Sequence, residues 1–391
     1  MRPADDQGAV YHRWQFWLSC ASLLVTILYL AWIVVGVQAD PSRHPRPTPL
    51  WWRDVALYAV ILGAGLKLLT SPLDWVRGYW LPTRFGLLHQ PFGRWCWDRA
   101  KAAAIGGALA LLALEIIYGF LQVSAWWWLW AALILFAGSL LLTVIVPIWV
   151  IPLFYQLVPL EGAALKERLL KLAQRVGVRV IGVWVADQSR KSRTANAALT
   201  GLGRTRRILL FDTLIAEFTP EEIESVLAHE LGHHVRGDVR RGLLVQGTAL
   251  LATFWAADYL LRLGSARFGY QGPADPWGLP LLALILLLLG LIAAPLANGF
   301  SRRLERQADA FALTTTGNPE AFISAMERLA KLNLAERRPN RLKEFVLYSH
   351  PSIERRIEMA QRFLSPLTLP LPSGERRRGE GHREGQGEGH S

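Results

Sequence analysis

Six long apolar runs dominate the chain. Most reach the roughly 20 residues that a helix needs to cross a bilayer, and few charged residues interrupt them, although Lys67 lies inside the second. The first run is too long for the apolar core of a signal peptide, so we expect it to be retained. The pattern therefore predicts six membrane-spanning helices, over 14–37, 55–71, 102–121, 126–150, 243–263 and 277–297.

The segments after the fourth and sixth runs have the patterns of a water-soluble domain. Helical periodicity covers 160–176, and 178–185 and 207–211 have strand-like patterns. Thr219, Pro220 and Glu222 are typical of the cap, first and third positions of a helix, which we expect to continue to about Arg236. Three further helices are predicted over 302–315, 319–332 and 351–363.

Composition and charge support a membrane protein. Of 391 residues, 52% are apolar and 19% are charged, against about 25% charged in soluble domains. The net charge of +12 arises mainly from 72–101 (+3), 153–242 (+4) and 298–372 (+4). Positive-inside counting places these segments and the N-terminus in the cytoplasm. Nucleic-acid binding is thus the weakest alternative, and Cys20 and Cys96 alone give no reason to expect a structural disulfide.

The helix predicted from Pro220 carries the strongest chemical motif, His229-Glu230-Leu231-Gly232-His233. Histidines four residues apart lie on one helical face and can bind one Zn²⁺ together, while Glu230 can take a proton from a water molecule there. The competing interpretation is a pair of exposed histidines on a polar helix. The strong helix start before the motif favours the metal site.

A catalytic zinc site needs a third protein ligand, and Glu305 is the best candidate. Asp309 lies on the same helical face, where it can support a ligand imidazole. By themselves these residues would be read as a charged helix face. However, the histidine motif precedes the fifth membrane run and Glu305 follows the sixth, so a helical hairpin brings both to the same edge of the membrane.

These motifs resemble the integral-membrane zinc metallopeptidases, which include the CAAX prenyl endopeptidases of the a-factor-converting type and the HtpX-type heat-shock proteases. The resemblance covers about residues 10–364. It rests on the two motifs above and on further segments similar to the CAAX branch: Arg84–Leu87 with Trp95, Asp98 and Lys101; Pro147–Glu161; Asn196-Ala197 with Gly201 and 208–213; and Tyr348–Pro351 with Arg356.

The resemblance implies a role for nine residues. His229, His233 and Glu305 would bind one catalytic Zn²⁺, with Asp309 supporting a ligand, and Glu230 would be the general base and acid. Asn196 and Ala197 would lie on an edge strand that pairs with an extended peptide substrate. His350 and Arg356 would bind substrate or stabilise the oxyanion of the reaction. Without the family, Asn196 would be read as a turn residue and His350 as a helix cap.

The expected fold is an all-α polytopic membrane protein with a small α+β zincin-like catalytic domain at the cytoplasmic face. Its expected segments are four membrane helices in 1–152, a catalytic segment in 153–242, two membrane helices in 243–300, cytoplasmic helices in 301–364 and a disordered tail in 365–391. The CAAX branch has seven membrane helices around a water-filled chamber, whereas this sequence predicts six.

The expected function is CAAX prenyl protease-like hydrolysis of peptide bonds at a zinc site, in a bacterial inner membrane or an ER-type membrane. The substrate would be a peptide or protein, prenylated or membrane-associated, with lipid as the other partner and no obligate protein partner or nucleic acid. Two alternatives stay open. One is an HtpX-like quality-control protease, and the other is a non-enzymatic transporter that uses Glu115 and Asp258 within its spans.

Overall fold

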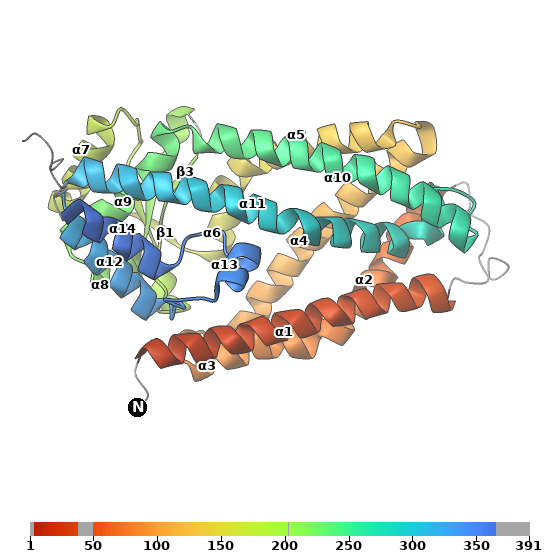
Figure 1. Ribbon diagram of the computed structural model, residues 1–391, viewed down its shortest axis with the longest axis horizontal. Coiled ribbons are helices and arrows are strands. Elements are labelled where there is room, and N and C mark those ends of the chain that lie inside the picture. The colour runs from red at the N-terminus through yellow and green to blue at the C-terminus, as the bar shows by residue number, and fades with distance from the viewer. Residues whose placement is uncertain (1–3, 38–49, 202, 365–391) are drawn as a thin grey trace, which may run out of the picture.

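Six long helices run along most of the length of the molecule in the computed structural model, which describes residues 4–37, 50–201 and 203–364 (Figure 1). Each is long and apolar enough to cross a membrane. For the described residues this confirms the six predicted spans, whereas the predicted tail over 365–391 lies outside them. The helices are α1 (Ala4–Trp32), α2 (Trp51–Trp75), α4 (Phe92–Val123), α5 (Trp127–Ile145), α10 (Asp238–Phe268) and α11 (Leu279–Thr316).

Several of these helices continue beyond the apolar runs that predict them. Charged residues end a run of hydrophobicity, but the backbone hydrogen bonds of the helix can continue into water or headgroups. Single π-helical turns prolong three of the helices, and short α-helices follow two of those turns. These extensions are Ile33–Val37 after α1, Val76–Trp80 and α3 (Leu81–Arg84) after α2, and Val146–Val150 and α6 (Ile151–Phe154) after α5.

One predicted break is wrong. The sixth span and the helix expected over 302–315 form a single helix, α11, that ends only before Gly317, whose φ is +61°. Pro295 lies inside this helix without ending it. The predicted segment boundaries at 242/243 and 300/301 accordingly fall within α10 and α11. Each of these two helices thus continues without interruption from the membrane-spanning part into the water-soluble part.

The water-soluble part contains a four-stranded sheet in the order β1-β2-β4-β3. β2 and β4 are parallel, while β1 and β3 pair antiparallel at the two edges. The strands are β1 (Leu157–Pro159), β2 (Val183–Ala186), β3 (Ala197–Thr200) and β4 (Arg207–Phe211). The helices around them are α7 (Ala163–Arg175), α8 (Asp212–Glu217), α9 (Pro220–Val235), α12 (Pro319–Leu332), α13 (Arg341–Leu347) and α14 (Ile353–Leu364).

The patterns predicted the central strands better than the edges of the sheet. β4 matches its prediction and β2 covers only the end of the predicted 178–185, because Gly182 with φ +157° precedes it. The three-residue strand β1 and the short helix α13 have no periodic pattern and were not predicted. The core between sheet and helices includes Leu169, Leu210 and Leu227.

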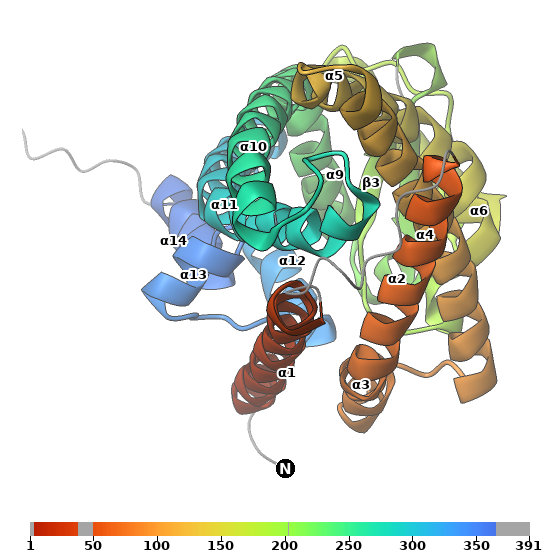
Figure 2. The same cartoon turned by 90° about the vertical axis from the view of Figure 1, so that its right-hand side faces the viewer.

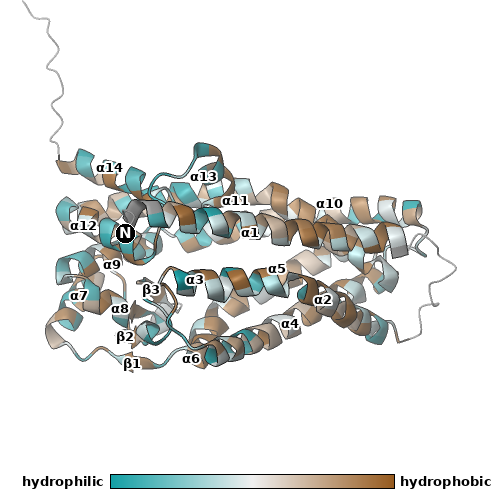
Figure 3. Cartoon of the chain, turned by 90° about the horizontal axis from the view of Figure 1, so that it is seen from below, coloured by the Kyte–Doolittle hydropathy of each residue, from teal (hydrophilic) through white to brown (hydrophobic). Residues whose placement is uncertain are grey.

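The six long helices form a closed ring, in which each contacts two neighbours in the order α11, α10, α5, α4, α2, α1 (Figure 2). Hydrophobic residues cover the ring, and hydrophilic residues concentrate at the end that carries the sheet (Figure 3). The α5 span illustrates this, since none of its most apolar 18-residue window is buried inside the protein. Such a surface requires lipid around it.

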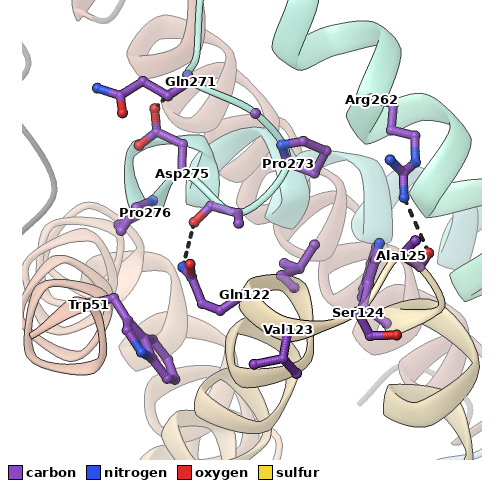
Figure 4. A pocket seen from close by; sticks show the side chains of 14 residues that line it. Trp51, Gln122, Val123, Ser124, Ala125, Arg262, Gln271, Pro273, Asp275 and Pro276 are labelled. Atoms are coloured by element: carbon purple, nitrogen blue, oxygen red, sulfur yellow. Dashed lines mark hydrogen bonds between the residues drawn. The ribbon is translucent and has the colours of Figure 1, made fainter. Parts of the chain in front are cut away.

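A cavity of about 700 Å³ lies at the end of the bundle away from the sheet (Figure 4). Two of its polar lining side chains are hydrogen-bonded to backbone carbonyls of the protein. Gln122 Nε2 donates to the carbonyl of Ala274 at 3.0 Å, and Arg262 donates to the carbonyl of Ala125 at 3.3 Å. None of the predicted site residues lines this cavity, so the chemistry must be sought at the other end.

Candidate metal centre and active site

Helix α9 carries the histidine motif and begins as its sequence predicts. Thr219 Oγ1 accepts from the backbone N–H of Glu222 and the Glu222 carboxylate accepts from the N–H of Thr219, which completes a capping box. One turn apart further along the helix, the rings of His229 and His233 lie 4.8 Å from centre to centre. A well-anchored helix start thus fixes the spacing of both imidazoles.

Helix α11 packs along α9 and brings in the acidic residues. Gly232, inside the histidine motif, makes this approach possible: a Cβ there would lie 3.3 Å from Cα of Ala308 and 3.0 Å from the Phe311 ring. A larger residue would force the two helices apart. The glycine at this position therefore sets how closely Glu305 approaches the two histidines.

Three ligand-type side chains converge where the helices meet. His229 Nε2 lies 3.3 Å from His233 Nε2 and 3.3 Å from Glu305 Oε2, and His233 Nε2 lies 3.4 Å from Glu305 Oε1. Their ligand atoms all lie within 4.8 Å of one another, close enough to hold one metal ion. The structure thus brings together the three residues that the sequence analysis assigned to the metal.

Carboxylates behind the two imidazoles orient them. His229 Nδ1 lies 2.8 Å from Asp309 Oδ1, and His233 Nδ1 lies 3.0 Å from Asp238 Oδ2. Both Nδ1 atoms can therefore donate to a carboxylate, which leaves both Nε2 atoms free to face the metal position, the usual arrangement of metal-binding histidines. The side chains of Asp309 and Asp238 are 0% and 4% exposed.

Asp238 is the supporting residue that sequence reasoning missed. It follows Gly237, whose φ of +69° lets the chain turn from α9 into α10, and it is the first residue of α10. The signal in the sequence was an aspartate directly after a helix-ending glycine, five residues beyond His233. It was overlooked because that spacing implies no contact until the turn is known.

Arg356 is nearly buried and bound to Asp309 rather than open to a substrate. Its Nε lies 2.9 Å from Asp309 Oδ2, its Nη2 lies 2.5 Å from Oδ1, and Nη2 also contacts His229 Nδ1 at 3.3 Å. Arg356 thus neutralises the charge of the buried Asp309. Its predicted contact with the oxyanion stays a prediction.

His350 sits at the open side of the cluster. Its Nε2 lies 3.4 Å from Glu305 Oε1, its Nδ1 is 2.9 Å from Ser349 Oγ, and its side chain is 58% exposed. An exposed imidazole beside the three ligand residues can reach a molecule bound there. This position is compatible with the predicted role in substrate binding, which itself stays a prediction.

The protonation tendencies of α9 fit a site built for a cation. Burial lowers the pKa of His229, but the hydrogen bond to the Asp309 carboxylate and the nearness of the Glu305 carboxylate outweigh this effect and raise the pKa to about 9. Burial raises the pKa of Glu230, against the opposite effect of both histidines. Without a metal ion, the nearby carboxylates thus favour an imidazolium at His229. A proton and a metal ion therefore compete for this imidazole.

Asn196 and Ala197 lie where the sheet has a free edge. Ala197 begins β3 and Asn196 precedes it, and among the described residues β3 pairs only with β4. The Asn196 carbonyl accepts from the N–H of Phe211 at 3.0 Å, and its side-chain oxygen accepts from the N–H of Ala197 at 2.9 Å. β3 lies against α9, so an extended peptide added to this edge would pass close to the histidines.

Two histidines and a glutamate on membrane-anchored helices, with a second glutamate beside them, define a membrane metallopeptidase. Comparison with known families agrees. Residues 159–363 match peptidase family M48, and residues 7–156 match the family described as CAAX prenyl protease N-terminal, five membrane helices. The chain belongs to peptidase family M48.

Relatives in bacteria and yeasts are similar over most of the chain. A Bacillus subtilis protein named uncharacterized metalloprotease YhfN is 31% identical over 341 residues, which cover 86% of this chain and 80% of the relative. CAAX prenyl protease 1 of Saccharomyces cerevisiae is 29% identical, over 76% of this chain and 70% of the relative. The crystal structure of S. mikatae Ste24p superimposes with a TM-score of 0.74 at 27% identity, over 91% and 89% of the two chains.

These matches confirm the predicted family, fold class and enzyme class, and family membership implies a bound metal. The transporter interpretation loses its basis. The Asp258 carboxylate accepts hydrogen bonds from Trp127 of α5 and from Arg262, so it serves helix packing. One difference from the family remains: its N-terminal part is described with five membrane helices, whereas the described part of residues 7–156 has four.

Proposed function

We propose that the protein is a zinc endopeptidase of the CAAX prenyl protease type, whose active site faces the cytoplasm. The observation that carries the proposal is the convergence of His229, His233 and Glu305, with a buried carboxylate behind each imidazole. Two nitrogen ligands and one carboxylate, with a further position open, are typical of catalytic zinc.

The arrangement of the two Nε2 atoms and the Glu305 carboxylate suits a bound metal ion better than direct contacts among these atoms. Glu305 Oε2 is buried without a hydrogen-bond partner. When both histidines are neutral and donate through Nδ1, as metal ligands do, each Nε2 presents a lone pair to Glu305 at 3.3–3.4 Å. Neighbouring lone pairs repel, and a cation between them turns this repulsion into bonding. His229, His233 and Glu305 are therefore the residues that would hold Zn²⁺.

When bound, zinc would supply a polarised water molecule and an electrophile for the scissile carbonyl. Glu230, next to His229 on α9, would accept the proton of the attacking water and pass it to the amine that leaves. The raised pKa of Glu230 suits a group that must take up a proton and release it again. His350 would bind the substrate or its developing oxyanion from the exposed side.

The substrate would bind as an extended chain along β3, starting at Asn196 and Ala197, with backbone hydrogen bonds supplying affinity independently of sequence. Relatives named CAAX prenyl protease match this chain, including its N-terminal membrane part. We therefore favour a prenylated C-terminal peptide over the misfolded membrane proteins that an HtpX-like protease would degrade. The basic loops at the sheet end support an active site on the cytoplasmic side.

The test compares wild type with Glu230→Gln in purified, zinc-loaded protein. We expect Glu230→Gln to lower peptide cleavage about 10²–10⁴-fold, the usual contribution of a general base, while zinc content stays unchanged. Cleavage at the wild-type rate by this variant would contradict the mechanism. A prenylated peptide, its unprenylated twin and an unfolded membrane protein, assayed side by side, distinguish the two substrate classes.

A further inference from the structure

The segment that leads into β3 is held from several sides. Its Thr194 carbonyl accepts from Thr213 Oγ1 at 2.8 Å, and its Asn196 carbonyl accepts from the backbone N–H of Phe211. Both of these bonds come from β4 or the residues just after it. The residue between them, Ala195, is instead held from α12, far along the chain.

Asn333, directly after the last residue of α12, binds both backbone groups of Ala195. Asn333 Oδ1 accepts from the Ala195 N–H at 3.0 Å, and Asn333 Nδ2 donates to the Ala195 carbonyl at 3.2 Å. A side-chain amide carries a donor and an acceptor together, so it can imitate the backbone of a neighbouring strand. A carboxylate, a hydroxyl or an alkyl group cannot form this pair in the same way.

The turn that presents Asn333 is strained, and its central residue is buried. The Ala335 N–H returns to the Ala330 carbonyl at 2.9 Å, so α12 ends in a Schellman-type turn. Leu334 takes the left-handed position of this turn, with φ +49°, where glycine is the usual residue. Its side chain is 4% exposed. Burial of the leucine offsets the cost of this conformation.

The first membrane helix packs directly onto the same turn. At Gly8 of α1 a Cβ would lie 3.1 Å from the carbonyl oxygens of Leu334 and Ala335. A side chain at this position would meet these carbonyls more closely than an ordinary contact allows, so they would have to shift. The position of Asn333 therefore depends on three parts of the molecule, namely the end of α12, the buried Leu334 and the start of α1.

We propose that Asn333 is a positioning residue for the substrate. By holding Ala195 in place, Asn333 fixes the position and direction of Asn196 and Ala197 relative to an extended peptide. It thereby determines which peptide bond of the substrate faces the metal site. Asn333 contacts none of the metal-site residues among its described hydrogen bonds, so it acts through the strand. This inference rests on the proposed binding of peptides along β3.

The experiment measures Asn333→Ala, Asn333→Asp and the control Lys331→Ala, an exposed residue of the same helix, in the full-length, zinc-loaded protein. Two internally quenched peptides are compared, one of about eight residues that extends along β3 at about 3.3 Å per residue and one that ends before this strand. Zinc content and melting temperature in detergent are recorded for every variant.

We expect Asn333→Ala to lower kcat/KM for the long peptide about tenfold, the value of roughly one net hydrogen bond, mainly through a higher KM. Cleavage of the short peptide and zinc content should not change. Asn333→Asp should share the defect, because a carboxylate has no donor for the Ala195 carbonyl, and it provides the same test if the alanine variant does not fold. Lys331→Ala should match wild type.

Equal losses on both peptides, or wild-type kinetics in both Asn333 variants, would overturn the proposal. The role of Asn333 and the proposed function fail in different ways. If Glu230→Gln remains active, the peptidase mechanism itself is wrong. If Glu230→Gln is inactive while both Asn333 variants cleave the long peptide like wild type, only the positioning role is wrong.

Discussion

The membrane-spanning helix α5 and helix α9, which carries the histidine motif, are similar in length but differ in which side chains they bury. The span that begins with α5 and continues to Phe154 contains an 18-residue window with a mean hydropathy of 2.6, none of which is buried inside the protein. In α9 nine of 16 residues are buried, and among them are Glu222, Ser225 and His229. The membrane-spanning part thus exposes many apolar side chains on its outside, while the sheet end buries polar side chains.

The two helices differ in this way because their surroundings differ. Outward apolar residues cost nothing when lipid surrounds them, so packing inside the ring can be sparse. A buried charge is costly unless a partner neutralises it, and the sheet end provides partners for its charges, as Arg356 does for Asp309. Buried charges at the sheet end are therefore paired, and removal of one partner should cost more than changes on the lipid-facing side of the ring.

The largest expected effect comes from the metal position itself. Glu305→Ala should weaken zinc binding by more than about hundredfold, since loss of a direct ligand exceeds the 10–100-fold that loss of a supporting group costs. Peptide cleavage should disappear with the metal. Zinc is measured by mass spectrometry after dialysis, and Glu320→Ala on exposed α12 is the control. Full zinc occupancy in Glu305→Ala would mean that another residue is the third ligand.

Removal of the buried Asp309 should destabilise the sheet end most. Asp309→Ala leaves Arg356 buried without its counter-charge, which typically costs about 3–5 kcal/mol, so the melting temperature in detergent should fall clearly. Asp309→Ala with Arg356→Met should regain stability but not activity, because His229 still lacks its carboxylate. An unchanged melting temperature in the single variant would show that the pair is not buried as described.

A pair of leucines tests the comparison of the two regions directly. Leu227 in α9 is 0% exposed, and Leu112 in α4 is 57% exposed. Leu227→Ala should cost about 2–5 kcal/mol through the cavity that it leaves, whereas Leu112→Ala should stay within about 0.5 kcal/mol. Equal shifts in melting temperature would contradict the view that the ring presents its apolar side chains outward.

Loss of Asp238 should affect zinc binding less than loss of a direct ligand. Asp238→Ala frees the His233 ring without removing a ligand, so zinc affinity should fall about 10–100-fold while the fold stays intact. The measurement is competition with a chelator of known affinity, and Arg240→Ala, exposed on the same helix, serves as the control. If Asp238→Ala binds zinc like wild type, the contact between His233 and Asp238 has no role in the metal site.

Local patterns predicted most elements because they depend on neighbours in sequence. The capping box before α9 and the bounds of β4 and α12 follow from residues a few positions apart. Where patterns failed, the missing information was long-range. β1 is too short to have a period, and no local signal marks that α11 continues from the membrane through Glu305.

Hydrophobic runs and motif spacing were enough to predict the six membrane helices, the family and the candidate metal ligands, because they are local properties of the chain. The groups that support these residues are visible only in the folded structure. Asp238 behind His233, Arg356 on Asp309 and Asn333 on Ala195 join residues 5, 47 and 138 positions apart. Such contacts depend on how closely the helices pack and where the turns lead, and no spacing rule in the chain encodes them.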